Sequence, residues 1–330
     1  MNKDLSDLIV YSGLSHPSLA KRIVSHLDLP LGRSQSIVFS NENIMVRLQD
    51  NCRQKDVFVI QTSSSPVNDH LVELLILLDA IKYASAARVT AVLPYFPYGR
   101  SDKKDEPRIS IAARLVADLL QTAGADRVLT MNLHSPQIQG FFRIPVDQLL
   151  AAPIFFDYFN ETLFMEESKE DFVLVMGDAG AAKAFGYYSD ELNLPVAIVD
   201  KFRPDHSEKP IIRQIIGDVR GKSCLIVDDE ITSGGTLIEA AERLSAEGAK
   251  RILAAAVHPV LSGDAVKKLV ASPIERIIVG DTVPVREKIK GHENRFAVLD
   301  LSPLFAKAIL SIHNGSSISA LFPPSVRRRP

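Results

Sequence analysis

The sequence predicts an α/β protein of two consecutive domains, each a mainly parallel sheet flanked by helices. Apolar runs of strand length alternate with helical segments along most of the chain, which is the order that βαβ units produce. The chain has 330 residues, enough for two domains of ordinary size with separate cores. We place the boundary near residues 145–152 and predict one domain at residues 1–148 and a second at residues 149–330.

The elements of the first domain follow from apolar periodicity and from signals at their ends. Pro17 suits the first turn of a helix, and Asn68 is a suitable N-cap for another helix. Residues 41–43 separate two short strands and predict a hairpin. A long loop at residues 94–108 is rich in aromatic and charged side chains, and loops of that length are commonly functional. The predicted strands are residues 8–11, 36–40, 44–48, 56–62, 88–95 and 127–133, and the predicted helices are residues 16–27, 68–84 and 109–123.

The second domain continues this alternation. A polar segment at residues 200–209 follows one of its strands and predicts a flap. The tail at residues 323–330 is predicted to be a solvated end. The predicted strands are residues 172–176, 196–199, 211–216, 223–227, 251–257 and 275–279, and the predicted helices are residues 153–160, 181–192, 237–247 and 301–313.

Residues 227–236 are the most informative segment, because polar residues there join a strand to a helix. Gly234 and Gly235 permit positive φ and close approach of the backbone, while Ser233 and Thr236 add hydroxyl donors. Backbone N–H groups at a helix N-terminus bind anions, so this turn predicts a phosphate site. The sequence GxxxxGK[ST] is absent from the chain, which excludes a P-loop nucleotide site.

Two adjacent acids, Asp228 and Asp229, precede the turn. Ionised carboxylates only accept hydrogen bonds, so they suit vicinal hydroxyls or a metal ion rather than a phosphate. A sugar phosphate would satisfy both parts of the segment. The alternative is a strand-to-helix turn with Asp caps and no ligand, which would need fewer polar residues than are present.

Composition excludes several classes of protein. A net charge of −2 argues against bulk nucleic-acid binding. No stretch approaches the ~20 apolar residues of a membrane span, and the first residues show no signal peptide. Cys52 and Cys224 lack metal-ligand spacing, and low cysteine use fits a reducing compartment. We therefore expect a cytoplasmic protein that acts on small molecules, with no nucleic acid and no membrane as partner.

Several stretches beyond the phosphate turn make the chain similar to the ribose-phosphate pyrophosphokinases. The turn alone is less specific, because phosphoribosyltransferases share it. The resemblance covers residues 7–322 and implies two tandem phosphoribosyltransferase-like domains. It also implies a homo-oligomer, a dimer or a hexamer, in which a neighbouring subunit completes the nucleotide pocket. The stretches that carry the resemblance are residues 56–62, 66–69, 85–96, 132–142, 200–204 and 258–263.

The resemblance implies an activity as well: transfer of the diphosphoryl group of ATP to the C1 hydroxyl of ribose 5-phosphate, giving phosphoribosyl diphosphate and AMP, with Mg²⁺ as cofactor. Such a transfer needs positioning and charge neutralisation more than covalent help, and a Lys point charge with an Arg fork suits it. By themselves, those two cations are equally typical of a solvated loop, and a single histidine at a strand end is more often structural. The site residues that the resemblance implies are Lys201 and Arg203 for catalysis, Asp228, Asp229, Thr232, Ser233, Gly234, Gly235 and Thr236 for ribose phosphate, Phe39, Asn41, Asn43, Arg100 and Ser101 for the nucleotide, and His134 and Asp178 for the metal.

Some positions depart from the residues that are usual in the family. Residues 41–43 are Asn-Glu-Asn where Asp-Gly-Glu is usual, and Ser101 stands where Gln is usual. Asn132 and Thr232 each stand in place of an Asp. Besides the diphosphokinase, three functions therefore remain open: a phosphoribosyltransferase, a non-catalytic or regulatory homologue, and a diphosphotransferase with a different ribose-phosphate acceptor. The phosphoribosyltransferase explains the phosphate turn but leaves the other domain without a role.

Overall fold

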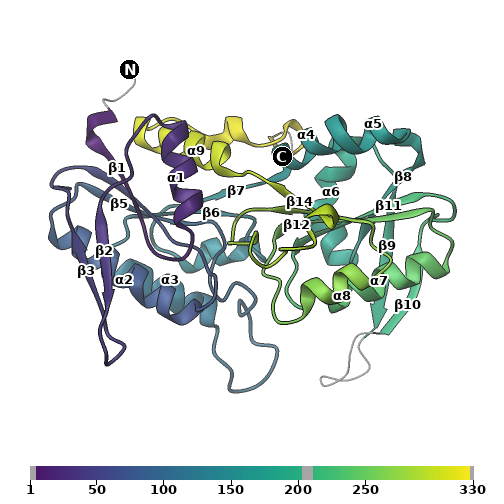
Figure 1. The fold of residues 1–330 in the computed structure, drawn as a ribbon, viewed down its shortest axis with the longest axis horizontal. Coiled ribbons are helices and arrows are strands. Elements are labelled where there is room, and N and C mark those ends of the chain that lie inside the picture. Colours follow the sequence, from purple (N-terminus) through teal and green to yellow (C-terminus); the bar gives the residue numbers. More distant parts are fainter. Residues whose placement is uncertain (1–4, 203–210, 328–330) are drawn as a thin grey trace. The chain divides into compact units, whose positions relative to one another are not determined.

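A computed structural model describes residues 5–202 and 211–327, and the chain divides into two compact units (Figure 1). The chain passes into the second unit after Leu150, two residues beyond the predicted end of the first domain. Residues 301–321, which contain the last long helix, belong to the first unit. The first unit comprises Met1–Leu150, Thr282–Pro284 and Leu301–Leu321, and the second comprises Ala151–Asp281, Val285–Asp300 and Phe322–Pro330.

The first unit is built on a parallel sheet, which the described residues form from five strands in the order β1-β4-β5-β6-β7. All residues of β4 are buried, as expected for a parallel strand with helices on both faces. Helices α2 and α3 pack on one face, and α1 and α9 pack together on the other (Figure 1). The bounds are β1 (Leu8–Ser12), β4 (Asp56–Ile60), β5 (Arg88–Leu93), β6 (Arg127–Met131), β7 (Val146–Leu149), α1 (Pro17–His26), α2 (Val67–Tyr83), α3 (Ala112–Thr122) and α9 (Ser302–Asn314), with short helical turns η1 (Leu5–Asp7), η2 (Pro136–Phe141) and η6 (Ile318–Leu321).

Helix α2 is positioned by its apolar face. Leu74 and Leu77 lie one turn apart and are both buried in the core of the first unit. The prediction that Asn68 caps this helix is wrong, because the N-cap is Pro66 and makes no side-chain capping bond. Asn68 instead accepts a hydrogen bond from the hydroxyl of Tyr98 at 2.5 Å, which links the helix to the loop after β5.

An antiparallel hairpin of β2 (Ser34–Val38) and β3 (Ile44–Leu48) lies between α1 and β4 in the chain. The predicted hairpin is confirmed, although its first strand begins at residue 34 rather than 36. In the turn, Oδ1 of Asn41 accepts the N–H of Asn43 at 3.2 Å, and Glu42 has a φ of 66°. Strand β3 packs against α2, so the hairpin is attached to the first unit through that helix (Figure 1).

A buried polar network holds α9 on the first unit. His313 is 1% exposed, and its Nδ1 lies 2.8 Å from Oδ2 of Asp56 at the start of β4. Arg88, at the start of β5, donates from Nε to Oδ1 of Asp56 at 2.8 Å and from Nη2 to the carbonyl of Ile312 at 2.9 Å. The partners of these contacts are far apart in the chain. The sequence does not reveal such contacts, so α9 was predicted to belong to the second domain because it follows that domain in the chain.

The second unit is built on a larger sheet, to which the described residues contribute seven strands in the order β10-β9-β8-β11-β12-β13-β14. Every adjacent pair is parallel except β10 and β9, so the predicted fold class is confirmed in both units. The bounds are β8 (Phe172–Met176), β9 (Val196–Phe202), β10 (Ile211–Ile216), β11 (Ser223–Glu230), β12 (Arg251–His258), β13 (Arg276–Gly280), β14 (Phe296–Leu299), α4 (Ala152–Tyr158), α5 (Phe164–Glu166), α6 (Ala179–Leu192), α7 (Gly235–Ala246), α8 (Ala265–Ala271) and α10 (Pro324–Arg327), with η3 (Phe159–Leu163), η4 (Lys169–Asp171) and η5 (Glu293–Arg295).

The C-terminal tail is more ordered than predicted, as far as the structure describes it. Residues 324–327 form α10, where the N–H of Ser325 donates to Glu191 of α6 at 3.1 Å. The expectation of a solvated end is therefore wrong for this part of the tail. No helix among the described residues has the length and apolar character needed to cross a membrane.

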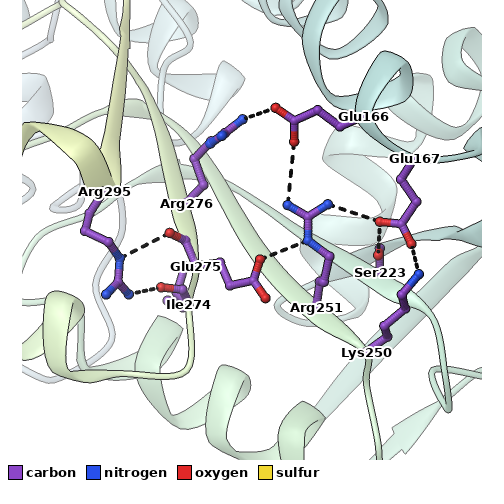
Figure 2. Close-up of polar contacts among 9 residues, drawn as sticks. All are labelled: Glu166, Glu167, Ser223, Lys250, Arg251, Ile274, Glu275, Arg276 and Arg295. Atoms are coloured by element: carbon purple, nitrogen blue, oxygen red, sulfur yellow. Dashed lines mark hydrogen bonds and ion pairs between the residues drawn. The ribbon is translucent and has the colours of Figure 1, made fainter.

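The amino ends of β12 and β13 are joined by ion pairs, and Ser223 at the start of β11 adds a hydrogen bond to Glu167 (Figure 2). Arg251 contacts three carboxylates: its Nη1 lies 3.1 Å from Glu167, its Nη2 lies 3.7 Å from Glu166, and its Nε lies 2.9 Å from Glu275. Glu167 also accepts a hydrogen bond from Nζ of Lys250 at 2.5 Å. These contacts fasten the segment that follows η3 to the amino edge of the sheet.

Candidate active site

The predicted ribose-phosphate segment lies at the carboxyl end of β11, where ligands bind in open α/β sheets. The strand extends to Glu230, so Asp228 and Asp229 belong to the strand, and the prediction of a loop beginning at residue 228 is wrong. Successive strand residues direct their side chains to opposite faces. The N–H of Asp229 donates to Oδ1 of Asp228 at 2.8 Å. The backbone therefore gives different directions to two acids that the sequence presents as a pair.

The glycine turn connects this strand to α7. Gly234 has a φ of 76°, and a Cβ there would lie 3.2 Å from Cγ of Leu269, so both conformation and packing require glycine. Gly235 begins α7, two residues earlier than predicted, and the nearest atom to a Cβ there would be Oγ of Ser233 at 3.8 Å. Packing within the chain therefore does not require glycine at position 235. Thr236 lies in the first turn, where backbone N–H groups lack partners within the helix.

A second loop, residues 259–263 after β12, supports the phosphate turn through the backbone. The N–H of Leu261 donates to the carbonyl of Ile231 at 2.9 Å, and the N–H of Ser262 donates to the carbonyl of Thr232 at 2.9 Å. Leu261 is buried and has a φ of 47°, a conformation that this pairing maintains. The sequence marked this loop as part of the resemblance, but gave no signal that it holds the turn.

Lys288 extends this support and was missed by sequence reasoning. Its Nζ donates to the carbonyl of Val260 at 2.5 Å. Burial lowers the pKa of the Lys288 ammonium below its usual value. No pattern in the sequence distinguishes this lysine from its neighbours, because the contact joins residues 28 positions apart.

Asp178, which the resemblance predicts to be near the metal, has a structural role in the described chain. It is the N-cap of α6, and its Oδ1 accepts the N–H of Ala181 at 2.7 Å. An Asp at this position satisfies one of the backbone donors at the helix start. The side chain is exposed at the carboxyl end of β8, next to β11 in the sheet. A metal role for Asp178 stays a prediction.

The predicted flap begins later than the sequence indicated. Strand β9 runs to Phe202, so Lys201 lies in a strand rather than in a loop, and its backbone pairs with Ile212 of β10. Strand β9 neighbours β8 on the side away from β11. Arg203 and the rest of the predicted flap up to residue 209 lie outside the described residues.

In the first unit, two predicted site residues lie on neighbouring loops at the carboxyl edge of the sheet. Arg100 follows β5 and His134 follows β6, and both are exposed. The loops are in contact, since a Cβ on Gly99 would lie 3.8 Å from Cβ of His134. Asn132, two residues before this histidine, is buried and has a φ of 38°. The structure therefore brings Arg100 and His134 to one edge of the sheet, and their roles toward a nucleotide and a metal stay predictions.

The other predicted nucleotide residues lie on two different elements of this unit. Ser101 closes the long loop after β5: its Oγ donates to the carbonyl of Ser110 at 3.2 Å and accepts the N–H of Ala112 at 3.2 Å. Phe39, Asn41 and Asn43 are exposed at the turn of the hairpin. Their roles toward a nucleotide stay predictions. In the described part of the chain, no cluster of three or more His, Cys, Asp or Glu residues is placed to hold a metal ion.

The fold and the turn before α7 define the class of protein: a two-unit α/β protein in which a glycine turn joins the end of a strand to the start of a helix. Comparison with known proteins makes the assignment specific. Residues 8–124 match the family model of the N-terminal domain of ribose phosphate pyrophosphokinase, and residues 188–323 match that of the phosphoribosyl synthetase-associated domain.

Curated relatives match over the whole chain. The ribose-phosphate pyrophosphokinase of Deinococcus radiodurans is 46% identical, with 98% of this chain and 100% of that protein covered. Ribose-phosphate pyrophosphokinase 4 of Saccharomyces cerevisiae is 43% identical, with 96% and 95% covered. The crystal structure of phosphoribosylpyrophosphate synthetase from Mycobacterium smegmatis superposes with a TM-score of 0.86 at 37% identity, covering 94% of this chain and 100% of that one. The chain belongs to the ribose-phosphate pyrophosphokinase family, which confirms the resemblance found in the sequence.

Proposed function

We propose that the protein is a ribose-phosphate diphosphokinase. The C1 hydroxyl oxygen of ribose 5-phosphate attacks the β-phosphorus of ATP and releases its proton. The bond from that phosphorus to the α,β-bridging oxygen breaks, and AMP leaves. The observation that carries the proposal is 46% identity to a curated ribose-phosphate pyrophosphokinase over the full length of both chains. A relative that matched only the domain with the phosphate turn would also be consistent with a phosphoribosyltransferase, because such an enzyme needs the turn but not the other domain.

The phosphate turn is the proposed site for the 5-phosphate of the sugar. Glycine at position 235 is not required by packing, and it leaves the face of the turn open to a ligand. The hydroxyls of Ser233 and Thr236 and the N–H groups of the first turn of α7 supply donors. Asp228, at the end of the strand, supplies an acceptor for the ribose hydroxyls. Together these groups form a binding site for a phosphorylated sugar diol.

Lys201 and Arg203 are the proposed catalytic cations. Negative charge develops on the bridging oxygen as AMP departs, and a preorganised cation stabilises it most in a site that excludes water. Lys supplies a point charge and Arg a planar fork for two phosphate oxygens. The position of Lys201 in β9, which shares a sheet with the strand before the phosphate turn, supports this role.

Mg²⁺ is the proposed cofactor. Mg²⁺ prefers oxygen ligands and usually keeps several waters, so it needs only one or two protein carboxylates beside the phosphates of its substrate. Asp178 fits this requirement because it is exposed and uses one carboxylate oxygen as an N-cap, leaving the second for a metal. His134 fits less well as a direct ligand, because its imidazole is a nitrogen donor. When bound, the ion would neutralise the charge of the transferred diphosphoryl group.

The nucleotide site is proposed to combine Arg100 and Ser101 with Phe39, Asn41 and Asn43. In this proposal the hairpin residues serve a neighbouring subunit of a homo-oligomer, a dimer or a hexamer. A cytoplasmic location, with no nucleic acid and no membrane as partner, completes the proposal.

The test is a direct assay of the purified protein with ATP, Mg²⁺ and ribose 5-phosphate, in which AMP and the sugar diphosphate are followed by mass spectrometry. The expected result is equal amounts of both products, and none when the acceptor or Mg²⁺ is omitted. Replacing ribose 5-phosphate by other ribose phosphates tests the choice of acceptor. Absence of sugar diphosphate with ribose 5-phosphate, in protein that still binds ATP, would favour the non-catalytic homologue.

A further inference from the structure

Glu73 of α2 is a buried carboxylate with an unusual set of partners. It is 1% exposed, and it accepts hydrogen bonds from the backbone N–H of Leu14 at 3.1 Å, from Oγ of Ser36 at 2.5 Å and from Nε2 of Gln61 at 2.7 Å. All three donors are neutral, and the described residues place no Lys, Arg or His in an ion pair with it. A buried carboxylate is costly unless its oxygens are hydrogen-bonded. The side chain of Glu73 is satisfied by these hydrogen bonds, without an ion pair among the described residues.

The three donors come from three separate segments of the first unit. Leu14 lies in the loop after β1, Ser36 lies in β2 of the hairpin, and Gln61 follows β4. A single buried side chain of α2 therefore joins this helix to the carboxyl edge of the sheet and to the hairpin.

Gln61 carries the connection further along the edge of the sheet. Its Oε1 accepts the N–H of Ser15 at 3.0 Å, while its Nε2 also donates to the carbonyl of His70 at 2.9 Å. A Cβ on Gly13 would lie 2.3 Å from Oε1 of Gln61, so this glycine is required by close packing. The loop at residues 13–15 is thus fixed by contacts with the buried side chain of Gln61.

The hairpin is the segment that most needs such a connection. Two-stranded hairpins are marginally stable by themselves. The turn of this hairpin is exposed, with Phe39 48% exposed. The bond from Ser36 to Glu73 joins β2 directly to α2, whereas the packing contact of the hairpin with this helix comes from β3.

We propose that Glu73 is a positioning residue for the nucleotide: it holds the hairpin in the orientation in which residues 39–43 bind ATP, without contacting ATP. The inference rests on the proposed function, because the nucleotide role of the hairpin is part of it. Glu73 would thus affect ATP binding from a buried position, through its hydrogen bond to Ser36 of the hairpin.

The test cuts the connection at its hairpin end. Ser36→Ala removes one donor and leaves Glu73 its two other bonds, so the protein is expected to fold. Ser34→Ala is the matched control, since Ser34 is the same residue type on the same face of the same strand and has no bond to Glu73 among the described residues. Ser36→Ala is expected to raise the KM for ATP about threefold to tenfold, equivalent to about 0.7–1.4 kcal/mol. The kcat and the KM for ribose 5-phosphate are expected to change less than about twofold.

Two further measurements separate positioning from general stability. Hydrogen exchange of the amides of residues 34–48 is expected to be faster in Ser36→Ala than in Ser34→Ala, at an unchanged melting temperature. Glu73→Gln is expected to raise the KM for ATP further, because its amide places a donor against existing donors. Ser36→Ala should then add little in the double variant, because both changes break one link.

The outcomes are distinct. An equal KM for ATP in the two serine variants, or full additivity of Ser36→Ala with Glu73→Gln, would overturn the inference and leave the proposed function standing. If the wild-type protein makes no sugar diphosphate, the proposed function is wrong. If calorimetry then shows that Ser36→Ala binds ATP more weakly than the wild type does, the inference about Glu73 is still supported.

Discussion

The two edges of the sheet in the second unit use charge in opposite ways. At the amino edge, Glu167 is 9% exposed at its side chain and accepts hydrogen bonds from Lys250, Arg251 and Ser223 (Figure 2). At the carboxyl edge, the acids of β11 precede a glycine turn whose backbone donors lie at the start of α7. Acids and bases of one chain are brought together at the first edge, whereas the second combines acids with backbone donors that suit an anion.

This difference indicates what each edge contributes. A carboxylate that the chain itself pairs adds to the stability of the fold, because its loss removes an ion-pair partner from cations such as Arg251. Unpaired backbone donors at the start of a helix suit a bound anion more than they support the fold. Substitutions at the amino edge should therefore change stability without kinetics, and substitutions at the carboxyl edge should change kinetics without stability.

The largest effect is expected at Lys201, at the carboxyl edge. Lys201→Ala should lower kcat on the order of 10²–10³-fold, comparable to the loss of one preorganised electrostatic donor, with nearly unchanged substrate KM and melting temperature. Lys222→Ala is the control, because this lysine lies at the amino edge and donates to the carbonyl of Glu170. Steady-state kinetics of both variants decide. A kcat within about threefold of wild type in Lys201→Ala would remove this residue from the chemistry.

Arg251 is expected to be the main determinant of stability at the amino edge. Arg251→Met keeps most of the aliphatic stem but removes a guanidinium shared by three carboxylates, so the free energy of unfolding should fall by about 2–4 kcal/mol. Urea unfolding measures the change, with Lys267→Met as control. The pair of Lys267 with Asp264 is exposed, and its loss should cost within about 0.5 kcal/mol. A KM or kcat of Arg251→Met that differs from wild type would contradict the division between the edges.

The acids of β11 should affect the sugar. Asp228→Ala or Asp229→Ala removes a charge-assisted acceptor worth about 1.5–3 kcal/mol, so the KM for ribose 5-phosphate should rise about 10- to 100-fold where that acid binds the diol. The strand directs the two side chains to opposite faces, so we expect the two variants to differ clearly. Equal increases in KM for the two variants would show that the direction of the side chain does not determine which acid binds the sugar. An unchanged KM and kcat in both variants would exclude both acids from the site.

The smallest effect is a pH dependence at the amino edge. Burial raises the pKa of Glu167, but hydrogen bonds from Lys250, Ser223 and Arg251 outweigh it and leave the pKa below its usual value of 4.5. A carboxylate with a lowered folded-state pKa stabilises the fold above its unfolded pKa, and that contribution is lost as pH falls through the folded pKa. Glu167→Gln should therefore cost about 1 kcal/mol at pH 7, and the difference from wild type should shrink below about pH 4.5. Unfolding curves at pH 7 and pH 4 measure both values, and a constant difference would contradict the assignment.

Local pattern was sufficient for much of this protein. The apolar runs of β4 and β8, the hairpin turn at residues 41–43 and the glycine turn before α7 were all predicted from neighbouring residues, because each depends on interactions within a few positions. Two short strands were not predicted. Strands β7 and β14 have four residues each, too few to show a clear hydrophobic period. The ends of β9 and β11 were also placed too early, since pairing with neighbouring strands continues the ladder through polar residues.

The sequence by itself determined the fold class, the family and the position of the phosphate turn, since these rest on strand and helix periods and on motifs of adjacent residues. Only the tertiary structure decided the rest. The buried contact of His313 with Asp56 places α9 on the first unit, and Glu73 gathers donors from three distant segments. Both depend on burial, which makes a polar contact necessary wherever the chain brings such groups together. No local pattern records which groups will meet.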